Sequence, residues 1–148
     1  MHSIQSSFIA LALSAVAASS ALAQSDVAQV AAKESGAKVT ASGLVFRSLQ
    51  DGQGASPSAT DKVKVHYRGT FPDGKEFDSS YKRNQPIDFP LNAVIPCWTE
   101  GVQLMKVGGK AKLTCPPGIA YGARGAGGVI PPNATLQFEV ELIAIAGR

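Results

Sequence analysis

The sequence predicts an α+β domain made of several antiparallel strands and one short amphipathic helix. Three observations support this fold class. Hydrophobic and polar residues alternate in the segments 62–68, 110–115 and 134–144, as they do in strands that bury one face. One segment, 98–106, instead places its hydrophobic residues at helical spacing. The 15 glycines and 9 prolines are typical of a small domain rich in strands and turns.

The first strands are expected before and after a turn-rich cluster. Residues 44–49 are predicted to form a strand that ends at this cluster, residues 51–61. The segment 62–68 then alternates with a period of two, so one of its faces should be buried. The apolar face carries Val63, Val65 and Tyr67, and the charged face carries Lys62, Lys64, His66 and Arg68.

A turn and the best helix candidate follow. Pro72 and Gly74 favour a turn, because proline presets φ and glycine adopts a left-handed conformation. Residues 75–78 should therefore return antiparallel to the previous strand, and a further short strand is expected at 87–89. The helix is predicted over 98–106, where one face carries Trp98, Val102 and Met105.

The C-terminal part is predicted to contain two strands separated by a long loop. Gly108 and Gly109 should end the helix. The strand 110–115 follows, then a loop rich in glycine and proline at 116–133, and a last strand at 134–144. The inward face of this last strand should carry Leu136, Phe138, Val140 and Leu142.

The N-terminus resembles a secretory signal peptide. Residues 8–23 form an apolar run that ends in Ala-Leu-Ala, the small-x-small pattern of a cleavage site, so residues 1–23 are predicted to be removed. The alternative is a buried or membrane-resident N-terminal helix. Residues 24–40 are polar and rich in alanine, and we expect a flexible segment there, or a frayed helix. The folded domain is assigned to residues 41–148, and the protein is expected to be exported, to the periplasm or beyond it.

Several functional classes find no support in the sequence. The formal net charge is +3 and acidic and basic residues are interspersed, so the sequence lacks the basic patch typical of a nucleic-acid-binding protein. The only histidines are His2, in the predicted signal, and His66, on a charged strand face, so a Ser-His-Asp or Cys-His arrangement has little support. No cluster of ligand residues predicts a metal, and the glycines of 122–128 lack the ending of a phosphate loop. No cofactor is expected.

Four blocks, taken together, resemble the FKBP family of peptidyl-prolyl isomerases. They are VHYRGTFPDGKEFDSSY at 65–81, VIPCWTEGVQLMKVGGKAKL at 94–113, AYGARG at 120–125 and VIPPNATLQFEVEL at 129–142. The blocks occur in the family's order over about the last hundred residues. The resemblance implies a strongly curved antiparallel sheet, a half-barrel, wrapped around one short helix. This expectation agrees with the α+β pattern of the residues themselves.

The resemblance also implies a pocket, carried over residue by residue. Its aromatic walls and floor would be Tyr67, Phe77, Trp98 and Phe138, its borders Val94 and Ile95, and its polar rim Asp78 and Tyr121. Ile87 and Ile130 complete the expected substrate-binding set, although many members carry a Phe at the position of Ile87. Taken alone, the aromatic positions lie on apolar faces and favour ordinary core packing over a pocket. Asp78 alone is compatible with a turn or cap, and Tyr121 with a loop anchor.

The activity implied by the resemblance is the isomerisation of X-Pro bonds in exported proteins as they fold. The expected partners are unfolded or partly folded polypeptides that contain proline, and macrolide inhibitors of the rapamycin type. A monomer is expected, with no membrane association after signal cleavage. The alternative, from a different functional class, is a binding module or chaperone that uses the same pocket without turnover.

Cys97 and Cys115 are predicted to form a disulfide. They are too few and too far apart for a zinc site or a CxxC redox motif. An even number of cysteines in an exported chain favours a bridge. Cys97 lies at the start of the predicted helix and Cys115 on the inward side of the next strand, so packing of helix on strand would bring them together. The alternative is two separate buried thiols.

Overall fold

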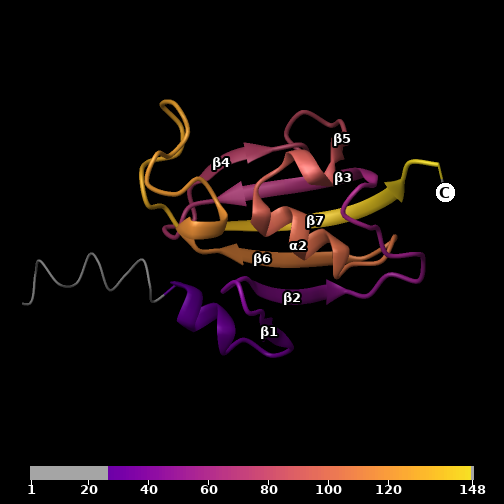
Figure 1. The fold of residues 1–148 in the computed structure, drawn as a ribbon, viewed down its shortest axis with the longest axis horizontal. Helices are drawn as coiled ribbons and strands as arrows, with labels where there is room; N and C mark the ends of the chain where they lie inside the picture. The colour runs from indigo at the N-terminus through magenta and orange to yellow at the C-terminus, as the bar shows by residue number, and fades with distance from the viewer. Residues whose placement is uncertain (1–26, 148) are drawn as a thin grey trace, which may run out of the picture.

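The computed structural model describes residues 27–147, which form a twisted, open antiparallel sheet with one short α-helix across its face (Figure 1). The seven strands are β1 (Ala37–Val39), β2 (Val45–Gln50), β3 (Lys62–Thr70), β4 (Glu76–Ser79), β5 (Ile87–Pro90), β6 (Lys110–Cys115) and β7 (Leu136–Ile145). The helical elements with defined bounds are η1 (Leu91–Ala93), α2 (Pro96–Gln103) and η2 (Pro117–Ile119). The predicted fold class is confirmed.

The strand order is β1-β2-β6-β7-β3-β4, with β5 also paired to β3. The outer edge of β3 is therefore shared by two short strands. Its first half pairs with β5, with Val63 opposite Phe89, and its second half pairs with β4, with Gly69 opposite Asp78. On its other edge β3 pairs along its whole length with β7. This arrangement places β4, β5 and β7 directly beside β3, and the candidate site forms where these four strands face α2.

The alternation in the sequence decides which face of the sheet is buried. In β3 the side chains of Val63, Val65 and Tyr67 are buried, as predicted, while Lys62 and Lys64 are exposed. Since β6 and β7 alternate in the same way and lie next to each other, their inward residues meet in one core under α2. The last strand begins at Leu136, two residues later than predicted, although Ala134 and Thr135 are already buried.

Helix α2 lies across one face of the sheet and contributes residues to the shared core (Figure 1). It begins at Pro96, which suits the first helical position because proline has no N–H to leave unpaired. The predicted face of Trp98, Val102 and Met105 is buried. Gly101 lets the helix approach the sheet, since a Cβ there would lie 2.9 Å from the side chain of Leu113.

The helix ends at Gln103 rather than at the predicted Lys106. The reason is a tightened last turn. The Leu104 and Met105 N–H groups donate to the carbonyls of Gly101 and Val102, three residues back, so the chain leaves α-helical geometry before it reaches Gly108. Met105 still packs into the core, which is why its position in the apolar periodicity misplaced the helix end.

The segment 24–40, expected to be flexible or a frayed helix, contains ordered structure where it is described. Residues 27–32 are helical, and β1 pairs with β2. Two ion pairs and one buried side chain account for this order. Glu34 accepts hydrogen bonds from Arg47 at 2.9 Å and Lys112 at 3.0 Å, and Ala31 is buried. The folded part therefore begins before residue 41, because these contacts are made by residues distant in the sequence.

The predicted signal peptide, residues 1–23, lies outside the described residues. Among residues 27–147, no helix combines the length and the hydrophobicity that a membrane crossing needs. The loop 116–133 runs from β6 to β7 and is held together by its own backbone. The N–H of Gly122 donates to Pro117 at 2.9 Å, that of Ala126 to Ile130 at 2.9 Å, and that of Asn133 to Gly122 at 2.8 Å. This loop therefore has the internal contacts to present Tyr121 in a defined place.

Candidate functional site

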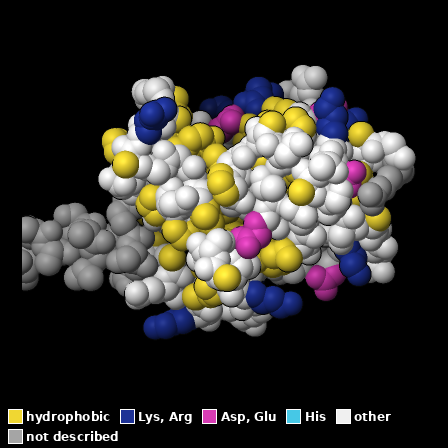
Figure 2. Space-filling view, in the orientation of Figure 1, with side chains coloured by type: hydrophobic (Ala, Val, Ile, Leu, Met, Phe, Trp, Pro, Cys, Tyr) yellow, Lys and Arg dark blue, Asp and Glu magenta, His cyan; other side chains and the backbone are white. Residues whose placement is uncertain are grey.

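A pocket of about 470 Å³ opens between α2, residues of β3, β4, β5 and β7, and the loop 116–133. Its lining residues are Tyr67, Phe77, Asp78, Phe89, Ala93, Val94, Ile95, Trp98, Tyr121 and Phe138. Its size falls in the range of small-ligand sites. Figure 2 shows hydrophobic side chains gathered on this face, between the loop 116–133 and α2. The structure thus brings eight of the ten pocket residues expected from the sequence into one cavity.

Trp98 is the centre of the aromatic lining. It is buried, and three rings surround it at right angles: Tyr67 at 5.2 Å, Phe89 at 5.4 Å and Phe138 at 5.5 Å between ring centres. Phe77 meets Phe138 edge to face at 5.6 Å. Such edge-to-face pairs are favourable because the positive edge of one ring meets the negative face of the next. The rings therefore hold one another in place, and the pocket is preformed.

The polar rim is built by three side chains. The Tyr67 hydroxyl donates a short hydrogen bond to Asp78 Oδ2. Arg83 donates to Asp78 Oδ1 at 2.7 Å and to the Tyr67 hydroxyl oxygen at 3.2 Å. The backbone N–H of Ser79 also donates to Asp78 Oδ1, at 2.9 Å. Asp78 is therefore held in one orientation at the edge of the aromatic cavity.

The rim sets the charge states of its two acidic groups. Burial raises the pKa of the Tyr67 hydroxyl above its ordinary value, and the hydrogen bond to Asp78 adds to this effect. Partial burial alone would raise the pKa of Asp78, but the hydrogen bonds from Arg83 and Tyr67 together outweigh it, so that pKa is lowered. At neutral pH the rim therefore holds a neutral phenol and an ionised carboxylate.

Two residues expected in the pocket lie outside its lining. Ile130 is buried in the core, and Ile87 is half-buried on β5. Phe89 follows Ile87 by two residues on the same face of β5. Phe89 lines the pocket in place of Ile87, and its ring contacts both Tyr67 and Trp98. The strand alternation at 87–89 and the aromatic residue type were the signals for Phe89. Ala93 is the other lining residue not expected from the sequence.

Arg83 is the functional candidate that sequence reasoning missed. It lies in the turn between β4 and β5, where a solvent-exposed arginine has no distinguishing local pattern. Only the folded chain places its guanidinium against two rim residues from different strands. The family motif around residues 65–81 ends just before it, so the motif did not mark it either.

His66 lies on the face of the sheet away from the pocket, as its alternation predicted, but it is half-buried there rather than open to solvent. Its ring stacks on Tyr81 at 4.5 Å, and its Nδ1 lies 2.8 Å from Ser80 Oγ. The hydroxyl of Tyr81 donates in turn to Glu141 at 3.0 Å. Within residues 27–147 no group of His, Cys, Asp and Glu side chains is arranged to hold a metal ion.

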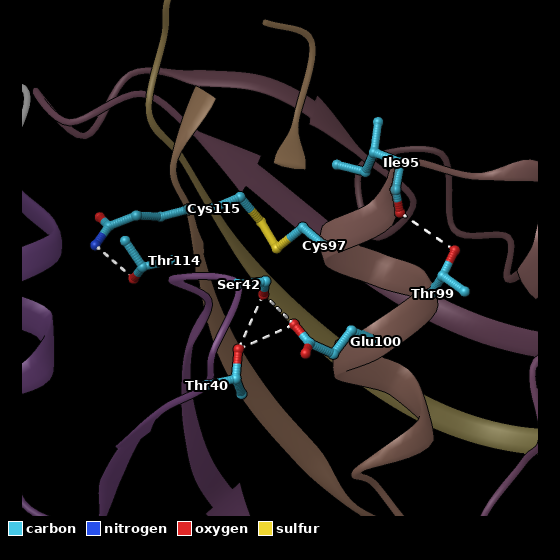
Figure 3. The surroundings of a disulfide bond; sticks show 9 residues. Thr40, Ser42, Ile95, Cys97, Thr99, Glu100, Thr114 and Cys115 are labelled. Carbon is cyan, nitrogen blue, oxygen red and sulfur yellow. Dashed lines mark hydrogen bonds between the residues drawn. A yellow bond between two sulfur atoms is a disulfide. The ribbon is translucent and has the colours of Figure 1, made fainter. Parts of the chain in front are cut away.

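The predicted disulfide between Cys97 and Cys115 is present, with Cα atoms 5.8 Å apart (Figure 3). It joins the first turn of α2 to the last residue of β6. Both cysteines are buried. Cys97 directly precedes Trp98, and Cys115 directly precedes the loop that carries Tyr121. The bridge therefore connects two segments that line the pocket.

The arrangement suits binding of a small apolar group next to a polar chain. The aromatic lining is apolar, while the rim and the start of α2 offer hydrogen-bonding groups. Ile95 is the residue before the helix, so its N–H is not used by helical hydrogen bonds. A group the size of a proline ring, with flanking peptide at the rim, fits this chemistry.

Comparison with known families gives one match that covers most of the chain. Residues 53–143 match the family described as FKBP-type peptidyl-prolyl cis-trans isomerase. The FKBP-type isomerase FkpA of Aeromonas hydrophila is 59% identical over 114 residues, which are 77% of this chain and 42% of that relative. The FKBP-type 22 kDa isomerase of Escherichia coli is 54% identical over 114 residues, 77% of this chain and 55% of that relative. The chain thus spans about half the length of these curated relatives.

Solved structures agree with these sequence matches. A peptidyl-prolyl cis-trans isomerase from Pseudomonas syringae superposes with a TM-score of 0.77 at 41% identity, covering 83% of this chain and 90% of that one. FkpA from Escherichia coli superposes with a TM-score of 0.77 at 40% identity, covering 97% of this chain and 74% of that one.

Proposed function

Because the chain belongs to the family of FKBP-type peptidyl-prolyl cis-trans isomerases, we propose that it accelerates cis–trans rotation of X-Pro bonds in exported polypeptides as they fold. The single observation that carries this proposal is the pocket, an aromatic cavity with an ordered polar rim. Its substrates would be unfolded or partly folded chains with an accessible proline. The alternative use of the same pocket is peptide binding without turnover.

The reaction needs no nucleophile, metal or cofactor supplied by the protein. An X-Pro bond rotates over a barrier of about 18–20 kcal/mol, because twisting it breaks the amide resonance. The twisted amide carries less charge on its oxygen than the planar one, so it tolerates a dry environment better. Each tenfold gain in rate requires about 1.4 kcal/mol of preferential stabilisation of this twisted state. A water-excluding aromatic pocket is suited to supply it.

The lining residues divide this work among them. Trp98 would form the floor under the proline ring, with Tyr67, Phe77 and Phe138 as walls. The Ile95 N–H would donate to a substrate carbonyl, since the helix leaves it unused. Asp78 would keep the rim ordered, and the half-exposed Tyr121 would contact the flanking peptide from the loop. Rapamycin-type macrolides would compete for the same cavity.

Export is part of the proposal. The signal-like segment 1–23 and the disulfide both point to an oxidising compartment outside the cytoplasm, such as the periplasm. We further propose that the domain acts as a monomer.

The test is a protease-coupled proline-peptide assay on the purified chain beginning at Gln24, compared with the full-length chain. We expect acceleration above the uncatalysed rate, and inhibition by rapamycin. Binding of rapamycin without any acceleration would assign the pocket to a binding module instead. Absence of both acceleration and binding would contradict the proposed function altogether.

A further inference from the structure

Gly69 occupies an unusual place for a glycine, in the second half of the long strand β3. It lies two residues after Tyr67 and therefore on the same, pocket-facing side of the sheet. It pairs with Asp78 on β4 and with Phe138 on β7, so both of its strand neighbours supply lining residues of the pocket. Glycine weakens a strand interior, because it has no side chain to pack and more conformational freedom to lose. Its presence here requires an explanation.

Backbone conformation does not supply that explanation. Gly69 is not among the residues with positive φ, so an L side chain could adopt its conformation. The strand pairing with β4 is irregular at this point, but a bulge without positive φ does not demand glycine.

The explanation lies in the two rings above it. A Cβ at Gly69 would lie 2.5 Å from Phe77 Cζ, 2.9 Å from Phe77 Cε1 and 3.0 Å from Phe138 Cε1. These distances are well inside ordinary carbon contacts of about 3.5–4.0 Å. The rings of Phe77 and Phe138 therefore fill the space that any side chain at this position would need.

We propose that Gly69 is a positioning residue: because it has no side chain, the Phe77 ring can pack against Phe138, and this fixes the width of the pocket. The expected loss of activity rests on the proposed isomerase function, whereas the expected displacement of the Phe77 ring does not. Phe77 is backed by Phe71, whose ring centre lies 4.9 Å away, and it meets Phe138 at 5.6 Å. A methyl group at Gly69 would push the Phe77 ring away from the sheet, and the open space available to it is the pocket.

The test uses Gly69→Ala, Phe77→Leu and the double variant. Gly69→Ala should lower kcat/KM by about tenfold to a hundredfold, as displacements near 1 Å do at catalytic sites. The loss should appear mainly in KM, together with weaker rapamycin binding, because the cavity is narrowed. In the Phe77→Leu background the same substitution should cost less than threefold, because the displaced ring is gone. Gly118→Ala is the matched control: a Cβ there meets nothing within 4 Å, and its φ is ordinary.

Two further measurements separate this role from a loss of folding. The protein has one tryptophan, Trp98, which contacts Phe138, so its emission should shift in Gly69→Ala while the urea unfolding transition stays cooperative. A crystal structure of Gly69→Ala should show the Phe77 ring displaced into the pocket.

An undisplaced ring, or an equal loss of activity with and without Phe77, would overturn the proposal. A wild-type chain without isomerase activity would instead contradict the proposed function, and the ring position in Gly69→Ala would still decide the role of Gly69.

Discussion

Cys97, in the first turn of α2, is bonded to Cys115, the last residue of β6, so the bridge ties the start of the helix to the sheet (Figure 3). Both residues are fully buried. The bridge spans a sequence separation of 18 residues. It therefore restrains the unfolded chain and fastens the helix that forms the pocket floor to the sheet.

Reduction of this disulfide is expected to lower the free energy of unfolding by roughly 3 kcal/mol, from the entropy of a loop of this size. Turnover of a proline peptide at moderate temperature should be largely retained, since neither sulfur has a role in the reaction. Urea unfolding with and without reductant measures the first effect. The Cys97→Ala/Cys115→Ala double variant is the control, because reductant should not change its stability. Titratable thiols in the denatured, exported protein would contradict the bridge.

Phe138→Ala is expected to remove most isomerase activity, whereas His66→Ala should remove almost none. Phe138 forms a wall of the pocket, but His66 lies on the opposite face of the sheet, against Tyr81. Because Phe138→Ala also costs about 3–5 kcal/mol of stability, Phe138→Leu should be assayed beside it. His66→Ala should cost about 1 kcal/mol through its contact with Ser80. A large loss of activity in folded His66→Ala would show that the face has been misassigned.

The hydrogen bonds of Asp78 predict a specific pH dependence of stability. Its pKa in the folded chain lies below the ordinary value of 3.8, so its ionised form stabilises the folded state above that pH. This stabilisation should disappear as the pH falls from about 4 through the lowered pKa. Asp78→Asn should flatten this part of the stability curve, and Arg83→Ala should flatten it partly, because Arg83 donates to the carboxylate. Urea unfolding between pH 2 and 6 measures it, and an unchanged curve in Asp78→Asn would refute the assignment.

Asp78→Ala should also lose most isomerase activity, because the carboxylate orders the hydroxyl of Tyr67 at the rim. Arg83→Ala should lose part of it for the same reason, since Arg83 contacts both groups. The protease-coupled assay on folded variants measures these effects. Arg124→Ala serves as a control, because that arginine is exposed on the loop and does not line the pocket. Full activity in Asp78→Ala would remove Asp78 from the proposed site.

Glu34 is expected to hold β1 onto the sheet. It pairs with Arg47 on β2 and Lys112 on β6, at 2.9 and 3.0 Å. Glu34→Gln should lower stability by about 1 kcal/mol or less and speed hydrogen exchange of the β1 amides, without changing turnover. Glu76→Gln removes an ion pair with Arg68 at the far side of the sheet and should leave β1 unaffected. Unchanged exchange in Glu34→Gln would show that backbone pairing alone holds β1.

Local patterns were sufficient to predict most of the fold. A period of two places every second side chain on one face, so the burial of Val63, Val65 and Tyr67 follows from their spacing alone. The same holds for the buried side of α2, from the spacing of Trp98, Val102 and Met105. The family motifs then indicated which of these buried aromatic residues line a pocket rather than only a core.

What the sequence by itself determined about this protein is therefore the type and the buried face of the strands and the helix predicted between residues 44 and 144. The tertiary structure alone decided which distant residues meet. Arg83 reaches Tyr67 from 16 positions away, and Gly69 is required only because Phe77 and Phe138 cross above it. The physical reason is that periodicity specifies the side of a strand or helix on which a residue lies. The neighbour it meets depends on strand register and packing, which arise only when the whole sheet assembles.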